Sequence, residues 1–221
     1  MGNKLAKVYS GGIFGIGGIH TYFVAFAADG TRLNKQDLPP PTEHENSFAV
    51  LLEWLDQREN SLEIVAVGHR IVHGGGVFTK PVRIDAAVIE QLEQLIPLAP
   101  LHQPHNVALV KILQKLQPQL PQIACFDNAF HSTMPPVACH FALPRDLTAA
   151  GIRRYGFHGL SYEYIVQVLP TIIGYLPERV IIAHLGNGVS LCALKGGRSI
   201  ATTMGFTPLD GIPMGTRPGT L

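Results

Sequence analysis

Charged residues are scarce in this sequence, and long apolar runs are missing from it. Only 15% of the 221 residues are Asp, Glu, Lys or Arg, and the formal net charge is +1. No basic run marks a nucleic-acid or anionic membrane surface, so we expect small-molecule partners and neither nucleic acid nor membrane. No apolar run approaches the ~20 residues of a membrane span. The glycine-broken stretch at residues 10–20 has no cleavage site after it, and we expect a cytoplasmic protein.

Cysteine is scarce as well. Cys125, Cys139 and Cys192 are odd in number and scattered, and two of them lie in apolar, strand-like runs. This usage predicts buried free thiols in a reducing compartment. The 46% share of hydrophobic residues predicts a well-filled core and argues against disorder.

Alternating strand and helix patterns predict an α/β fold with mostly parallel sheets. We expect strands at residues 21–27, 62–67, 123–126, 180–183 and 189–194, and helices at residues 47–57, 85–98, 106–116 and 161–169. Ser47 is a candidate helix N-cap. The run 180–183 is short and rich in β-branched residues, which is typical of a strand covered on both faces in a parallel sheet.

Two charged side chains follow predicted strands. Arg70 follows the strand at 62–67 and precedes three glycines, and Asp127 follows the strand at 123–126. The carboxyl ends of parallel strands are where α/β proteins place their clefts. Each residue also has an ordinary explanation, since a lone arginine is usually a surface residue and an aspartate often caps a helix. His102 lies in a connection between two prolines, where a histidine is more often structural than catalytic.

Two glycine-containing loops carry further candidate residues. The second loop, residues 184–188, places two glycines around Asn187, so that backbone N–H groups can converge on an anion. The strands expected on either side of this loop predict a hairpin with a polar tip, and an ordinary Asn-Gly turn explains the same residues. The first loop, residues 153–159, sets His158 beside two cations, an aromatic pair and two glycines, directly before a predicted helix.

Six stretches in fixed order resemble motifs of the acetate kinase family. They are VGHRIVHGG (67–75), LAPLHQPHN (98–106), CFDNAFHSTMP (125–135), RRYGFHG (153–159), AHLGNG (183–188) and TTMGFTPLDGIPMGTRPG (202–219). Six ordered motifs are far more specific than one glycine loop. The resemblance implies the actin-like ATPase (ribonuclease H-like) fold, in which two related α/β domains surround a cleft. The domains implied here are residues 1–130 and an incomplete second domain at 131–221.

The resemblance also implies a function and a set of site residues. The family reversibly transfers the γ-phosphoryl group of ATP to acetate, with Mg²⁺ or Mn²⁺, and forms acetyl phosphate. By motif position, the catalytic residues are Arg70, Asp127, His158 and Arg217. The substrate pocket adds Val72, Leu101, His102, Phe157 and Pro208 to the two arginines. The nucleotide phosphates are assigned to His184, Leu185, Gly186, Asn187 and Gly188. Asp127 lies near the metal in this family, and a homodimer is implied for its full-length members.

This chain departs from the family pattern in several places. The first strand with its phosphate turn, the adenosine pocket and the glutamate that helps to hold magnesium have no counterpart in the sequence. Five residues differ from the usual ones. Threonine is common at the positions of Asn128 and Leu160, histidine at Tyr162, a small residue at Val189 and aspartate at Thr220. We therefore expect a poor kinase or a non-catalytic fragment.

Two further alternatives concern the substrate and the reaction class. A propionate or butyrate kinase would share the same motifs. A metal-dependent hydrolase would use some of the ten histidines with Asp127, although the sequence contains no H-E-x-x-H pattern.

Overall fold

The computed structural model describes residues 6–58 and 63–220. The chain forms two compact units, one made of residues 1–64 and 111–118 and the other of residues 65–110 and 119–221. The domain boundary expected near residue 130 falls inside the second unit and stays a prediction.

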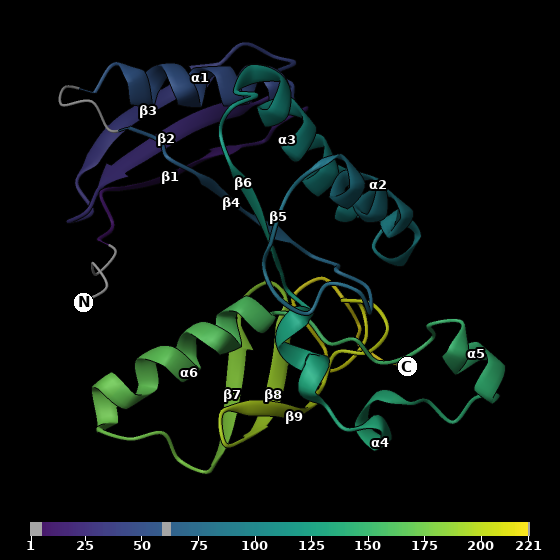
Figure 1. Cartoon of the computed structure of the whole chain (residues 1–221). Coiled ribbons are helices and arrows are strands. Elements are labelled where there is room, and N and C mark those ends of the chain that lie inside the picture. Colours follow the sequence, from purple (N-terminus) through teal and green to yellow (C-terminus); the bar gives the residue numbers. More distant parts are fainter. Residues whose placement is uncertain (1–5, 59–62, 221) are drawn as a thin grey trace. The chain divides into compact units, whose positions relative to one another are not determined.

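The first unit is an antiparallel sheet that packs against one helix. Its elements, in sheet order, are β1 (Tyr9–Phe14), β2 (Thr21–Ala27) and β3 (Arg32–Leu38), followed along the chain by α1 (His44–Asp56). Thr21, Phe23 and Ala25 alternate along β2 and are buried, as the expected strand at 21–27 requires. The ring of Phe23 meets that of Trp54 from α1 edge to face, at 5.6 Å between centroids. One face of the sheet therefore forms the core of this unit (Figure 1).

The start of α1 differs from the prediction. The helix begins at His44 with Glu43 as its N-cap, and Ser47 lies inside the first turn. The Ser47 hydroxyl donates to the Glu43 carbonyl oxygen, at 2.9 Å. Ser47 is therefore not a cap, because its side chain bonds back to the preceding turn instead of to the free N–H groups.

The second unit contains a mixed sheet with β4 (Val67–Ile71), β6 (Gln122–Phe126) and β5 (Val82–Arg83) in this order. The pair β4 and β6 is parallel, and β5 is antiparallel to β6. The connecting helices are α2 (Ala86–Gln94), the 3-10 turn η1 (Ile96–Leu98) and α3 (Gln103–Leu116), of which residues 111–116 belong to the first unit. Figure 1 shows α2 and α3 on one side of this sheet. The core between them consists of Ile71, Phe78, Ile89, Leu92, Val107, Val110, Ala124 and Phe126.

The strand expected at residues 62–67 is wrong in position. Residues 63–66 are not in a strand, Val65 is 69% exposed, and residue 62 lies outside the described residues. The strand runs from Val67 to Ile71 because this segment, and not the apolar run before it, pairs with β6. Arg70 therefore lies within a strand and not in the loop after it.

A second sheet in this unit is entirely antiparallel, in the order β7 (Arg179–Leu185), β8 (Val189–Lys195) and β9 (Arg198–Thr202). The prediction of a doubly covered parallel strand at 180–183 is wrong, since Ile181 of β7 is 76% exposed. The expectation of mostly parallel sheets is also wrong, because among the described strands only β4 and β6 pair in parallel. A connection of three residues between β7 and β8 allows only a hairpin.

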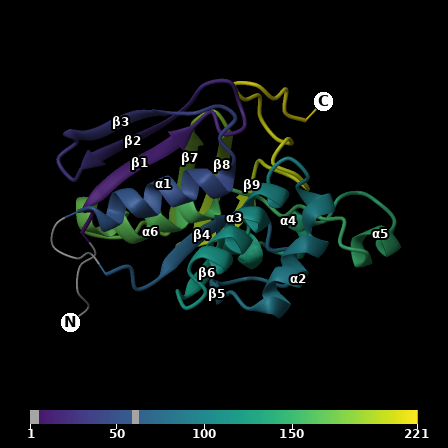
Figure 2. The same cartoon turned by 90° about the horizontal axis from the view of Figure 1, so that it is seen from above.

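Helix α6 (Gly159–Ile173) covers the second sheet, and its Tyr162 packs with Ile182, Cys192 and Leu194. The short helix η2 (Ala129–Thr133) joins the two sheets. Two small helices, α4 (Pro136–Cys139) and α5 (Arg145–Ala149), belong to a segment that extends away from the β7–β8–β9 sheet (Figures 1 and 2). Of the three free thiols, Cys139 and Cys192 are buried as expected, and Cys125 is only partly buried.

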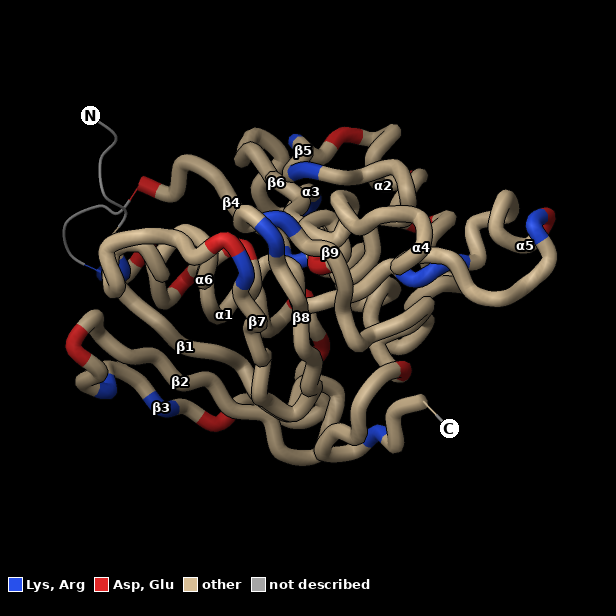
Figure 3. Tube along the Cα trace, turned by 90° about the horizontal axis from the view of Figure 1, so that it is seen from below, with Lys and Arg blue, Asp and Glu red and all other residues tan. Residues whose placement is uncertain are grey.

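Charge is spread thinly over the molecule. Figure 3 shows Lys and Arg scattered among Asp and Glu along the trace, with no long block of one sign. Within the described ranges, no helix combines the length and the apolar character that crossing a bilayer requires.

Candidate functional site

A cavity of ≈ 400 Å³ in the second unit gathers most of the candidate residues. It is lined by Arg70, Val72, Leu101, His102, His105, Asn106, Asp127, Phe157, His158, His184, Gly188, Pro208 and Arg217. All of these except His105 and Asn106 were expected from the sequence. Leu185, Gly186 and Asn187 were also expected and do not line the cavity. The fold therefore brings residues that are far apart in the chain to one cavity. Most of the residues next to them in the sequence do not line it.

The Arg70 and Asp127 side chains pair with each other in the lining of this cavity. Parallel pairing of β4 with β6 sets Arg70 beside Cys125, so that Asp127 follows two residues later. Nε of Arg70 lies 3.1 and 3.0 Å from the two carboxylate oxygens, and Nη2 lies 2.7 Å from Oδ2. The hydrogen bond to Asp127 raises the pKa of Arg70. Arg70 is thus held as a fixed cation, and its Nη1 takes no part in these three bonds.

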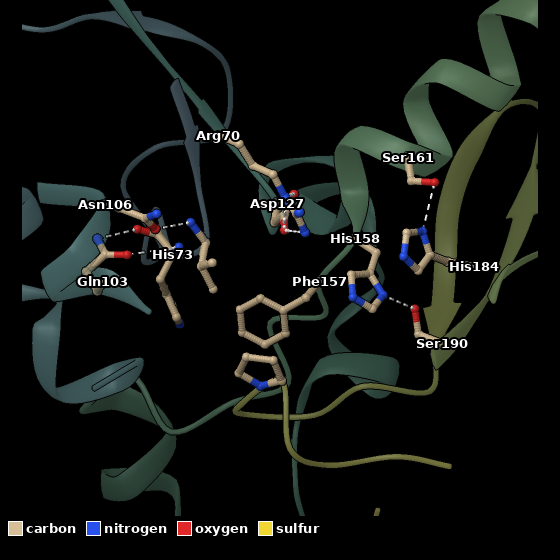
Figure 4. A network of polar contacts seen from close by, with 12 residues as sticks. Arg70, His73, Gln103, Asn106, Asp127, Phe157, His158, Ser161, His184 and Ser190 are labelled. Carbon is tan, nitrogen blue, oxygen red and sulfur yellow. Dashed lines mark hydrogen bonds and ion pairs between the residues drawn. The ribbon is translucent and has the colours of Figure 1, made fainter. Parts of the chain in front are cut away.

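Backbone geometry brings His158 next to Asp127. The Gly159 N–H donates to the Asp127 carbonyl oxygen at 2.6 Å, and His158 adopts a left-handed conformation with φ of 62°. A Cβ at position 159 would come within 2.3 Å of that carbonyl oxygen, so only glycine fits there. Figure 4 shows the His158 ring beside the His184 ring, with centroids 4.0 Å apart.

Burial, together with smaller contributions from the nearby His184, Arg70, Arg217 and His131, lowers the pKa of His158 to about 4. The imidazole is therefore neutral at physiological pH. Its Nδ1 is 2.8 Å from the Ser190 hydroxyl, and its Nε2 faces Gly188. The ring therefore offers the cavity one nitrogen and no net charge.

Gly188 leaves open the space between His158 and Arg217. A Cβ on Gly188 would lie 3.1 Å from His158 Nε2 and 3.5 Å from Arg217 Nη1. The Arg217 Nη1 group donates to the Pro208 carbonyl oxygen at 2.9 Å. His184 is fixed from behind, because its Nδ1 lies 3.0 Å from the Ser161 hydroxyl (Figure 4). An anion at this point would face one guanidinium group and two imidazole rings.

The loop between β7 and β8 is both a hairpin turn and part of the site. Leu185 pairs with Val189 across the hairpin, and Leu185 is 77% exposed. The Gly186 N–H donates to the Gly188 carbonyl oxygen, at 3.2 Å. Asn187 packs against Gly215, and a Cβ on Gly215 would lie 2.9 Å from Oδ1 of Asn187. The two interpretations of this loop are compatible, because His184 and Gly188 reach the cavity while the tip of the turn does not.

The cavity has one apolar wall, which consists of Val72, Leu101, Phe157 and Pro208. Phe157 is buried in a cluster with Tyr155 and Met204, whereas Leu101 is 67% exposed. A ligand that fits this cavity therefore has a negative end near the arginines and a small apolar end near Phe157.

His105 and Asn106 were missed because α3 begins earlier than expected. The prediction started the helix at residue 106, whereas it begins at Gln103. Starting there places His102, His105 and Asn106 on one helix face at spacings of three and four residues. Asn106 Oδ1 accepts a hydrogen bond from the Val72 N–H at 3.0 Å, which supports the apolar wall. Pro104 gave the missed signal, since proline is favoured in the first turn of a helix.

The site offers no preformed cage for a metal ion. In the part of the chain that the structure describes, no group of three or more His, Cys, Asp or Glu side chains is arranged to hold one. Both oxygens of Asp127 already accept hydrogen bonds from Arg70. A hard cation such as Mg²⁺ needs several oxygen ligands, so the described residues do not fit a metal bound by protein groups alone.

Known proteins resemble this chain over nearly all of its residues. Residues 5–221 match the model of the Acetokinase family. An acetate kinase of Rhodopseudomonas palustris is 51% identical over 216 residues, covering 97% of this chain and 54% of that protein. A propionate kinase structure from Francisella tularensis is 39% identical with a TM-score of 0.90, covering 97% of this chain and 55% of that chain. The Porphyromonas gingivalis acetate kinase structure gives 37% and 0.85, with the same coverage. The chain thus spans about half the length of these relatives.

Proposed function

Because this chain belongs to the acetokinase family, we propose that its cavity binds a short carboxylate and serves reversible phosphoryl transfer from ATP to acetate. The observation that carries the proposal is the position of His158 and Arg217 on either side of Gly188, in one cavity with the Arg70–Asp127 pair. Acetate has one charged end and one methyl group, and the cavity has arginines and an apolar wall to match them.

In this proposal the acetate carboxylate lies near Arg70 and Arg217, with its methyl group toward Val72 and Phe157. One carboxylate oxygen attacks the γ-phosphorus of ATP while the bond from phosphorus to the ADP oxygen breaks, which gives acetyl phosphate and ADP. The attacking group is already ionised at neutral pH, so the step requires no general base. Catalysis then depends on positioning and on positive charge around the phosphoryl oxygens.

Each protein group has a distinct task. The two guanidinium groups stabilise charge on the transferring phosphoryl group, and Asp127 keeps Arg70 oriented by the paired hydrogen bonds. His158 donates a hydrogen bond to a phosphoryl oxygen. We assign the nucleotide phosphates to the side of His184, Asn187 and Gly188. The Gly186 N–H is already used within the turn.

Mg²⁺ or Mn²⁺, when bound with ATP, neutralises charge on the nucleotide phosphates. Since the described residues form no cage for such an ion, the proposed roles of the protein groups do not depend on one. A cytoplasmic location and a homodimer also remain expectations from the family. Sedimentation velocity on the purified chain tests the second, because a dimer would sediment as a species of twice the monomer mass.

The test is an assay of the purified chain with Mg-ATP and acetate, in which hydroxylamine traps acetyl phosphate. Because the sequence predicts a poor kinase, we expect at most a slow formation of acyl hydroxamate with acetate, and none with glycerol or glucose as acceptors. Phosphorylation of glycerol or glucose without any reaction of acetate would overturn the proposal.

A binding measurement covers the case of slow turnover. We expect acetyl phosphate to bind the chain in a calorimetric titration and Arg217→Ala to weaken this binding at least tenfold, since it removes one cation from the anion. Arg179→Ala, which changes an arginine on β7 outside the cavity lining, is the matched control. Equal binding by the chain and the Arg217 variant would contradict the assignment of the cavity.

A further inference from the structure

Two buried hydroxyl groups stand behind His158, on the side away from the cavity. Ser190 of β8 places its Oγ 2.8 Å from His158 Nδ1 (Figure 4). The Tyr162 hydroxyl of α6 forms a hydrogen bond with the same Oγ. Tyr162 and Ser190 are both fully buried. The three side chains form one continuous chain of hydrogen bonds that begins in the core and ends at the site.

The directions of these hydrogen bonds follow from the number of protons available. Burial raises the pKa of Tyr162 to about 12, so its phenol keeps its proton at neutral pH. Within the described residues, the Tyr162 hydroxyl has Ser190 as its one hydrogen-bond partner, and buried O–H groups are hydrogen-bonded in proteins. Tyr162 therefore donates to Ser190 Oγ.

Ser190 then has one proton of its own and one remaining neighbour. A serine hydroxyl donates once and accepts at its lone pairs. Because its oxygen accepts from Tyr162, its proton goes to His158 Nδ1. A neutral imidazole carries a proton on one nitrogen only, so the ring proton must be on Nε2.

We propose that Tyr162 and Ser190 are positioning residues that fix His158 as the Nε2–H tautomer, so that an N–H donor and not a lone pair faces the cavity. The role of this donor in phosphoryl transfer rests on the proposed function, whereas the tautomer itself does not. Phosphoryl and carboxylate oxygens accept hydrogen bonds, and the opposite tautomer would set a lone pair against them.

The other neighbours of His158 hold the ring but do not choose its tautomer. His184 stacks on its face, and Gly159 anchors the backbone to Asp127. The charged and titratable groups around the ring are Arg70, Arg217, His131 and His184. None of them accepts a proton from Nδ1 in the described hydrogen bonds, so the choice depends on Ser190 and, through it, on Tyr162.

Tyr162 also marks a difference from the family pattern, in which the sequence resemblance implies a histidine at this position. A phenol donates one proton in one direction. An imidazole could donate or accept and would leave the direction of the Ser190 hydroxyl open. With a tyrosine at position 162, the direction of the hydrogen bonds from Tyr162 through Ser190 to His158 thus depends on the phenol group alone.

Nuclear magnetic resonance on the chain with ¹⁵N-labelled histidine tests the proposal directly. Two-bond correlations between ring protons and ring nitrogens report the tautomer of each imidazole, and loss of one peak set in His158→Gln identifies His158. We expect the wild-type ring at pH 7 to be Nε2–H. An Nδ1–H pattern in the wild type would overturn the proposal, and this measurement requires no other variant to fold.

Two variants then separate the contributions of the hydroxyls. We expect Ser190→Ala and Tyr162→Phe to give a mixture of both tautomers, since each removes a step of the chain. Tyr164→Phe is the matched control, because Tyr164 lies on the same helix with 62% of its surface exposed. A pure Nε2–H tautomer in both Ser190→Ala and Tyr162→Phe would also overturn the proposal.

Kinetics distinguish this proposal from the proposed function. If the chain turns over acetate, we expect Tyr162→Phe to lower kcat about tenfold with the KM for acetate nearly unchanged, as for other residues that orient a functional group. An Nε2–H tautomer without any turnover would support the positioning role of Tyr162 and Ser190 and contradict the proposed function. Turnover with an Nδ1–H tautomer would support the proposed function and contradict the positioning role.

Discussion

The Asp127 carboxylate accepts hydrogen bonds from both Nε and Nη2 of Arg70, and this links two strands at the carboxyl ends of their parallel pair. Arg70 remains largely exposed, whereas Asp127 is almost fully buried. A buried carboxylate without its cation would be costly, and an exposed arginine without its carboxylate would sample many rotamers. The two side chains therefore fix each other and form one structural unit.

We predict that Asp127→Asn lowers kcat by about 10²–10³, because Arg70 loses its fixed orientation toward the phosphoryl group. Steady-state kinetics with acetate and Mg-ATP provide the measurement. Asp146→Asn, on the exposed surface of α5, serves as the control and should leave kcat unchanged. Wild-type kcat in Asp127→Asn would mean that the orientation of Arg70 does not matter.

The sequence singled out these two residues through a local pattern, a strand followed by a charged residue; Asp127 does follow β6, whereas Arg70 lies within β4. It predicted the hairpin of β7 and β8, which are adjacent in the chain, but not the pairing of β4 with β6, which are separated by two helices. Residues 63–66, before β4, have no partner strand in the part of the chain that the structure describes, and they stay outside the sheets. Pairing is decided by contacts that are distant in the chain, and a local pattern cannot report them.

The supporting residues of the site were hidden for the same reason. Ser190 meets His158 across 32 positions, and Tyr162 meets Ser190 across 28. The family motifs identified His158 itself, whereas the hydroxyls behind it become visible only when α6 and β8 lie side by side. Asn106 was missed through an error of one helical turn in the start of α3.

Substrate size should depend on Val72. This side chain lines the apolar wall, and replacing it with alanine adds room for one methylene group. We predict that Val72→Ala raises kcat/KM for propionate relative to kcat/KM for acetate. The change should correspond to about 1–3 kcal/mol in activation free energy. Competition between the two acids in one assay measures this ratio directly. An unchanged ratio would place the methyl group of the substrate somewhere else.

Gly188 should tolerate no side chain if its backbone lies beside the reacting groups. A Cβ there would meet His158 Nε2 at 3.1 Å and would fill the space next to Arg217. We predict that Gly188→Ala lowers kcat/KM at least tenfold, by displacing His158 by a few tenths of an ångström. Gly68→Ala is the matched control, because a Cβ at this strand position meets nothing within 4 Å. Full activity in Gly188→Ala would show that the anion binds elsewhere.

Stability should fall as the pH drops below neutrality, and buried histidines set the range. Burial lowers the pKa of His73, His131 and His158 to about 4 each, from an ordinary value of 6.5. Between these two values the unfolded chain binds protons that the folded chain does not. The free energy of unfolding then decreases with falling pH, by at most about 1.4 kcal/mol per pH unit for each ring.

Urea denaturation at pH 7, 6 and 5 tests this expectation. The full contribution of the three rings should be present above pH 6.5 and should be lost progressively toward pH 4, where the folded rings also take up protons. His131→Gln removes one of these groups, and since its amide keeps a donor and an acceptor for Ser199 and Phe157, we expect the slope to decrease by at most about 1.4 kcal/mol per pH unit. A free energy of unfolding that stays constant from pH 7 to pH 5 would mean that these rings are protonated in the folded chain, and His158 would then enter the cavity as a cation.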